Sequence, residues 1–122
     1  MSEQYVNTVQ EIPFSDQLKR LETKYAFKHK EEAFNFIQAN PQLESLLNDA
    51  VNPIKEFFPK SSLHLGVFHD PESPTGNHLV LGISTQMRAK EALKELDKLD
   101  EGWWSENIER AKGKLSIELD YQ

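Results

Sequence analysis

Residues 93–121 constrain the fold more than any other part of the chain. Leucines at helical spacing over residues 93–99 predict an amphipathic helix, and a break that carries both tryptophans, Trp103 and Trp104, follows it. Residues 115–121 then alternate apolar and polar side chains, which is typical of a half-buried β-strand. A helix stripe and a strand face each have to be buried against another element, so this stretch predicts a domain that contains both helices and a sheet.

The remaining elements follow from apolar periodicity and from turn-forming residues. Pro53 lies inside an expected helix and predicts a kink or a restart there, capped by Asn52. Asp100 is expected to end one helix and to cap the next, and Gly113 to permit a left-handed stop. The expected helices cover residues 16–27, 30–39, 41–58, 86–99 and 101–111, and the expected strands cover residues 62–69, 78–84 and 115–121.

The order of these elements predicts an α+β fold in which N-terminal helices precede a β-β-α-β unit. We expect a three-stranded, mostly antiparallel sheet with the helices packed on one face. Placing strand 62–69 in the centre makes both of its neighbours antiparallel. In this interpretation residues 29–122 form the α+β domain, and residues 1–28 form an appended arm and helix whose apolar residues are too sparse to build a core. The length of 122 residues fits one domain.

The composition excludes several classes of function. The net charge is −6, from 14 basic and 20 acidic residues, which argues against the concentrated basic face that duplex nucleic acid requires. Because the sequence has no cysteine, disulfides, thiolate catalysis and cysteine-ligated zinc are excluded. No apolar run approaches the ~20 residues of a membrane span, and the first residues lack the basic start and apolar core of a signal peptide. We therefore expect a cytoplasmic protein that binds neither nucleic acid nor membranes.

The C-terminal part also carries a pattern that resembles an uncharacterised family of small bacterial α+β proteins. The most specific part is the pair of motifs Asp100-Glu101-x-Trp103-Trp104 and Arg110-Ala111-x-Gly113-Lys114-Leu115. The resemblance covers about residues 30–121. It implies the same fold outline and transfers no catalytic residue, because no activity is established for that family.

The candidates for binding a protein partner are two aromatic residues of the break, three residues of the strands and one arginine: Trp103, Trp104, Gly66, Phe68, Gly82 and Arg110. Adjacent helical residues point about 100° apart, so one tryptophan is expected in the core and the other nearer the surface, where an aromatic side chain can anchor a partner. The two glycines lie within strands, opposite the leucines, and permit close approach of a backbone, a helix or a ligand. The structural alternatives are tryptophans that only cover the core edge and an ion pair between Arg110 and Asp100.

The weak candidates for a metal or ligand site are His69, Asp70 and His78, which flank the loop between the first two strands. The ligand spacing of structural zinc is absent, so solvated histidines are the default interpretation and no cofactor is expected. The sequence has neither a nucleophile elbow nor a glycine-rich phosphate loop, so no catalytic residue is assigned.

The sequence therefore favours a non-enzymatic protein-interaction module. Its binding surface is expected on the sheet face with Gly66, Phe68 and Gly82, or near Trp104. A neutralising partner of the antitoxin or immunity kind and a self-associating homodimer are concrete forms, since acidic domains can mask basic surfaces. The alternative is a small ligand- or metal-binding domain, or a hydrolase, that uses the corner of His69, Asp70 and His78. An enzyme is the less favoured class.

Overall fold

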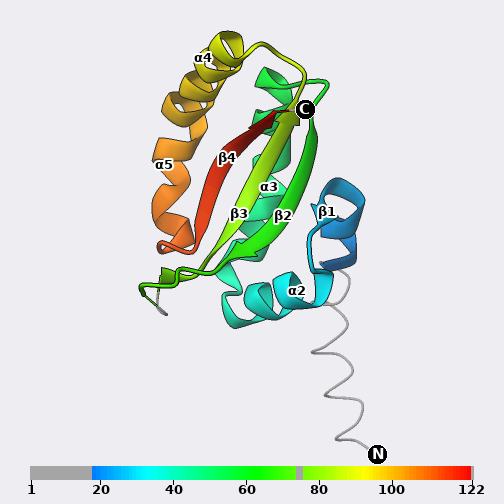
Figure 1. Cartoon of the computed structure of the whole chain (residues 1–122), viewed down its shortest axis with the longest axis vertical. Helices are drawn as coiled ribbons and strands as arrows, with labels where there is room; N and C mark the ends of the chain where they lie inside the picture. Colours follow the sequence, from blue (N-terminus) through cyan, green and yellow to red (C-terminus); the bar gives the residue numbers. More distant parts are fainter. Residues whose placement is uncertain (1–17, 74–75, 122) are drawn as a thin grey trace, which may run out of the picture.

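The computed structural model describes residues 18–73 and 76–121, and it is an α+β protein, as predicted. One mixed sheet has the strand order β1-β2-β3-β4, and helices precede β2 and connect β3 to β4 (Figure 1). Residues 18–24 are helical as well. No helix among the described residues has the length and apolarity needed to cross a membrane. The elements are β1 (Ala26–Phe27), α2 (Lys30–Ala39), α3 (Gln42–Phe57), β2 (Ser62–Phe68), β3 (His78–Thr85), α4 (Ala89–Leu99), α5 (Ser105–Asn107) and β4 (Leu115–Tyr121).

The sheet differs from the predicted one in strand number and strand order. β3 lies between β2 and β4, antiparallel to β2 and parallel to β4, and β1 pairs with β2 in parallel over two residues. The prediction of three mostly antiparallel strands, with strand 62–69 between the other two, is therefore wrong. The connection through α4 returns the chain directly beside β3, which makes that pair parallel. β1 is too short to show any alternation of apolar and polar residues.

The core lies between one face of the sheet and the helices, as predicted. Helix α3 presents a continuous apolar stripe to this face, because its buried residues recur every three or four positions. In Figure 1, α3 passes behind the strands, and the opposite face of the sheet is turned towards the viewer. The strands contribute buried Leu63, Leu65, Leu79, Leu81, Ile83 and Leu115, and the partly buried Val67, Ile117 and Leu119 pack against the same cluster.

Helix α3 is one element and runs through Pro53. Proline has no N–H group, so the carbonyl of Asp49 cannot receive its usual intrahelical hydrogen bond. The buried residues on both sides of Pro53, Ala50 and Ile54 among them, hold the helix against the sheet. The predicted restart at Asn52 is therefore wrong.

Residues 18–27 belong to the same core. Leu21 and Tyr25 are buried, and the Tyr25 hydroxyl donates a hydrogen bond of 2.6 Å to the carbonyl of Leu47 in α3. Ala26 and Phe27 then form β1. These contacts join residues 18–27 to the domain and do not set them apart as an appended segment. The rest of the predicted arm, residues 1–17, lies outside the described residues.

Helix α4 ends at Leu99, as predicted, but Asp100 does not start a new, separately capped helix. The chain continues as a π-helical segment, Asp100–Trp104, in which the Ser105 N–H donates to the carbonyl of Asp100. Asp100 has helical backbone angles, and no side-chain hydrogen bond caps the start of the π-helical segment. After α5 and a 3₁₀ turn (Ile108–Ala111), the chain turns through two left-handed residues. One of them is Gly113, with φ 76°, which confirms the predicted left-handed stop.

Candidate functional site

The two tryptophans lie on the π-helical segment and stack on each other. Their ring centroids are 6.0 Å apart, with 23° between the planes. Trp104 is buried and Trp103 is partly exposed, which confirms that one lies in the core and the other nearer the surface. Because a π-helical turn contains more residues than an α-helical turn, adjacent side chains diverge by less than about 100° there, and this helps the rings to stack.

A hollow of about 240 Å³ opens beside Trp104, and we call it the Trp104 hollow. Its size suits one large apolar side chain better than a small molecule, whose sites occupy roughly 300 to 1,000 Å³. Four apolar residues and two aspartates from α4, the π-helical segment and β4 line it: Leu96, Leu99, Trp104, Ile117, Asp97 and Asp100. The hollow therefore combines an apolar interior with negative charge.

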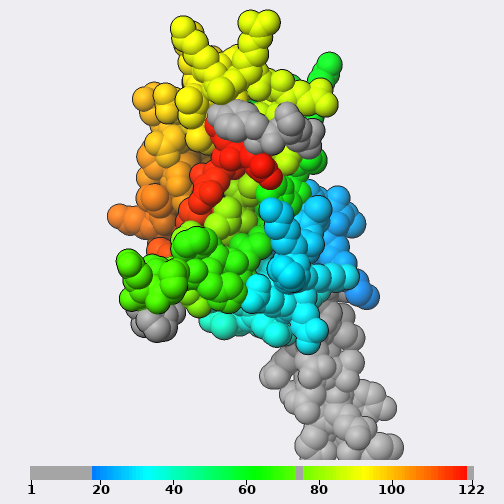
Figure 2. Space-filling view, in the orientation of Figure 1, coloured from blue at the N-terminus to red at the C-terminus, as the bar shows by residue number. Residues whose placement is uncertain are grey.

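β4 forms the edge of the sheet next to this hollow. The Leu79 N–H donates to the carbonyl of Lys114 over 2.8 Å, so the even-numbered residues of β4 direct their backbone groups towards β3. The N–H and C=O groups of Leu115, Ile117 and Leu119 therefore point away from β3, and within the described part of the chain no strand pairs with them. Figure 2 shows β4 at the surface, between α5 and β3.

The open face of the sheet carries Gly82, but a side chain of the same chain already covers it. A Cβ built at Gly82 would lie 2.1 Å from Nε2 of His64. The imidazole crosses the central strand towards Asp120, whose Oδ2 is 3.3 Å from Nε2. Burial lowers the pKa of His64, the nearby Lys28 ammonium lowers it further, and Asp120 opposes both effects. The close approach that glycine permits here is thus made by His64.

Gly66 on the same face is covered in a similar way. A Cβ at this position would lie 3.4 Å from Cβ of Lys28, so the stem of that lysine packs over the glycine. Phe68 is 48% exposed, and its ring centroid lies 5.2 Å from that of His78. Two aromatic rings and a lysine stem thus border this part of the open face.

The corner of His69, Asp70 and His78 does not come together as one site. His69 Nε2 lies 2.7 Å from a carboxylate oxygen of Glu32 in α2. The Asp70 carboxylate accepts a backbone N–H within its own loop at 2.9 Å, and His78 Nδ1 lies 3.1 Å from a carbonyl of the same loop. Within residues 18–73 and 76–121, no group of three or more histidine, aspartate or glutamate side chains is arranged to hold a metal ion.

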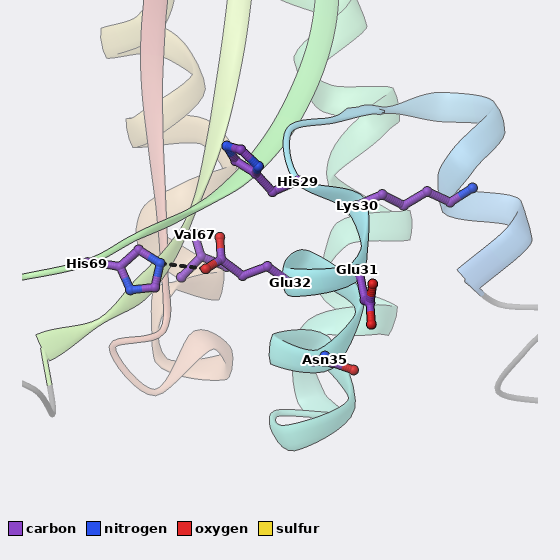
Figure 3. A pocket seen from close by; sticks show the side chains of 7 residues that line it. All are labelled: His29, Lys30, Glu31, Glu32, Asn35, Val67 and His69. Carbon is purple, nitrogen blue, oxygen red and sulfur yellow. Dashed lines mark hydrogen bonds and ion pairs between the residues drawn. The ribbon is translucent and has the colours of Figure 1, made fainter.

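The pair of His69 and Glu32 lies in a wide hollow of about 900 Å³ at the start of α2 (Figure 3). The two side chains turn towards each other, whereas Lys30 and Glu31 point elsewhere. The His69 side chain is 60% exposed and that of Glu32 is 41% exposed. An open, polar surface of this kind lacks the enclosed apolar walls of a small-molecule site.

Arg110 is held by α3 and not by Asp100. Its Nη2 donates to Oδ2 of Asp49 at 2.9 Å and to Oγ of Ser45 at 3.0 Å, and its Nη1 donates to Oδ1 of Asn107 at 3.0 Å. The predicted pair with Asp100 is therefore wrong. Arg110 ties the 3₁₀ turn to α3, and this contact fixes the helical segment that carries the tryptophans.

Sequence reasoning missed two features of this arrangement. Leu96 and Ile117 have the spacing of ordinary core residues, and only their placement on two adjoining elements reveals the hollow. The contact between His64 and Asp120 requires the strand order to be known. A usable signal was present for His64 alone, because Gly82 lies on the same sheet face in a neighbouring strand.

Comparison of the chain with protein-family models, with curated proteins and with solved structures gives no match. The resemblance to a bacterial family therefore stays a prediction. Function has to be argued from the surfaces of this chain.

Proposed function

We propose that this chain is a non-enzymatic protein-interaction module that binds its partner where the Trp104 hollow meets the outer edge of β4. The observation that carries this proposal is the double role of Ile117. Its side chain lines the hollow, and its backbone N–H and C=O groups point outward from the sheet. A partner seated there gains apolar contact and main-chain hydrogen bonds at the same place.

The titratable groups favour binding over catalysis. A catalytic acid–base pair needs two groups whose pKa values are driven apart inside a cleft. The pair of His64 and Asp120 lies on the open face of the sheet, and the pair of His69 and Glu32 is exposed to solvent. The alternative function, a ligand- or metal-binding domain or a hydrolase at the hairpin corner, has less support because its three side chains have separate contacts.

Two concrete forms of the module follow from the charge of the chain. A neutralising partner of the antitoxin or immunity type would use the net charge of −6 to attract and mask a basic surface. A self-associating module would bury the same surface in a homodimer. The acidic residues beside the hollow favour the first form, because two copies would bring like charges together.

A pair of matched variants tests the proposed binding surface. Leu96 and Leu93 lie on the same helix, but Leu96 lines the hollow whereas Leu93 is 52% exposed and does not. The wild-type chain and the Leu93→Gln variant are expected to capture the same proteins from an extract of the source cells. The Leu96→Gln variant should retain them about ten-fold less well, since a polar group then faces the apolar anchor.

Near-ultraviolet circular dichroism of the three proteins serves as the control for correct folding. Mass spectrometry compares the captured proteins. If Leu96→Gln is folded and captures the same proteins as the wild type in the same amounts, the hollow is not the binding surface and the proposed function is wrong.

A further inference from the structure

We propose that the partner presents an extended, basic segment, which joins the sheet as a further strand beside β4. This inference rests on the proposed function and specifies the chemistry of the partner. Three features of the described residues carry it: the direction of the backbone groups of β4, the apolar hollow beneath the edge, and the carboxylates on both sides of it.

The backbone of β4 has the geometry that strand addition uses. Leu115, Ile117 and Leu119 each direct one donor and one acceptor away from β3, at the spacing of every second residue. A further strand would lie about 4.8 Å beyond β4. Figure 1 shows α4 and α5 beside β4 on this side, and α3 behind the strands. Because α4 contacts α3, it belongs to the helix layer that covers the core face of the sheet.

The hollow gives the added strand a place for one anchor side chain. Successive residues of a strand point to opposite faces, so every second residue of the partner would face the helix layer. Leu96, Leu99 and Trp104 line the hollow on that side. Its volume of about 240 Å³ accepts one large apolar residue, such as phenylalanine or leucine. The partner segment therefore needs an apolar residue flanked by residues that face the open side.

The charges around the edge select basic residues for the remaining positions. Glu118 and Asp120 are exposed on the open face of β4, and Asp97 and Asp100 line the hollow on the other face. Directly opposed side chains of neighbouring strands lie about 5 Å apart, so lysine or arginine in the partner would reach these carboxylates. Lys114 precedes β4, which places the acidic part of the edge towards the end of the strand.

The same carboxylates act against the pairing of two copies of β4. An antiparallel pair of identical strands would place Glu118 and Asp120 near their own copies, and like charges opposite each other destabilise a strand pair. The negative charge of the β4 edge therefore disfavours pairing with a second copy of β4 and favours pairing with a basic strand. Specificity of this kind combines attraction to one partner with repulsion of another.

A set of three capped heptapeptides tests the inference on the full chain. The first is Lys-Val-Lys-Phe-Lys-Val-Lys, the second has Glu in place of each Lys, and the third has Pro in place of each Val and so lacks two N–H donors. Titration followed by tryptophan fluorescence gives the affinity. Hydrogen exchange of the Ile117 and Leu119 amides reports pairing along the outer edge of β4.

The lysine peptide is expected to bind, to slow exchange at these two amides, and to bind about ten-fold more tightly than the glutamate peptide. The proline peptide should give no protection, because it keeps the charge but cannot complete the ladder. Glu118→Gln should lower the affinity for the lysine peptide about three-fold, and Leu96→Gln should lower it further. Leu93→Gln should leave this affinity unchanged.

Three results would overturn the inference: equal binding of the lysine and glutamate peptides, protection confined to residues outside β4, or no binding of the lysine peptide at millimolar concentration. Each of these leaves the capture of a partner through the Trp104 hollow intact as a separate result. The proposed function itself is contradicted by a different result: capture of the same proteins in the same amounts by Leu96→Gln and by the wild type.

Discussion

The imidazole of His64 lies across Gly82, so that a Cβ at position 82 would be 2.1 Å from Nε2 and 2.5 Å from Cε1. The missing side chain on the central strand allows a residue of β2 to reach Asp120 on β4. One side-chain contact therefore links three strands on the face of the sheet that lies opposite α3.

Replacing Gly82 by Ala is expected to lower the free energy of unfolding by about 1–2 kcal/mol, because the ring must move and its contact with Asp120 is lost. Urea titration measures the change. Gly102→Ala is the matched control, since an added Cβ there meets no atom within 4 Å. The free energy of unfolding of Gly102→Ala should rise by up to about 1 kcal/mol, because Gly102 lies in a helical segment and alanine favours helix more than glycine does. If Gly82→Ala lowers the free energy of unfolding as much in a His64→Ala background as in the wild type, the His64 ring is not what excludes a side chain at position 82.

Stability is expected to fall as the pH decreases through the range in which His64 titrates. Its folded pKa is lower than the ordinary value of 6.5, so the unfolded chain binds this proton at a higher pH than the folded chain. The contribution of neutral His64 to the free energy of unfolding is fully present above about pH 6.5. It declines as the pH falls from 6.5 to the folded pKa. Urea midpoints at about pH 7.5 and pH 5 measure the decline. His64→Gln should show a smaller decline, and an equal decline in both proteins would contradict the assignment.

Removal of residues 1–28 is expected to leave a protein without fixed tertiary packing. Leu21 and Tyr25 are buried, and the loss of one buried leucine alone typically costs about 2–5 kcal/mol. Tyr25→Phe should cost about 1 kcal/mol, since the carbonyl of Leu47 then loses its buried donor. Near-ultraviolet circular dichroism and urea titration report both effects. Removal of residues 1–17 is the control, because it spares this packing. A cooperative transition near that of the full chain after removal of residues 1–28 would show that the segment is dispensable.

Glu118 is expected to limit the association of two chains through β4. Replacing it by Thr keeps a residue suited to a strand and removes one charge from the exposed edge. The apparent mass at high protein concentration should increase for Glu118→Thr and not for Glu106→Thr, which removes an exposed charge from α5. Sedimentation velocity makes the comparison. A wild-type dimer held by main-chain hydrogen bonds between two copies of β4 would contradict this role.

Local patterns in the sequence were sufficient to place the three long strands. The order of the strands could not be predicted in this way, because it depends on contacts between residues far apart in the sequence. Alternating side chains and turn formers predicted strands over 62–69, 78–84 and 115–121, within one residue of β2, β3 and β4. Which strand lies in the centre depends on where the connection through α4 returns the chain. The two residues of β1 are held by pairing with β2, and no pattern of their own predicts them.

The candidate site was predictable in its aromatic residues and not in its other parts. Two adjacent tryptophans in a helical segment implied one buried ring and one nearer the surface, and the structure agrees. The partner of Arg110 could not be inferred, because Asp49 lies 61 positions earlier in the chain and carries no pattern that links them. The hollow itself depends on how far α4 stands from β4, which sequence periodicity does not encode.

The π-helical turn at Asp100–Trp104 is the place in this helix where the chain can lose a residue without losing register. The turn accommodates one residue more than an α-helical path would need. Because the Ser105 N–H donates to the carbonyl of Asp100 five positions earlier, deleting Gly102 would convert this contact into a regular α-helical hydrogen bond. The residues after the turn would then keep their orientation around the helix axis, and Arg110 would still reach Asp49. Deleting a residue from a regular turn of α4 would instead rotate every later residue of the helix by about 100° and displace the wall of the hollow.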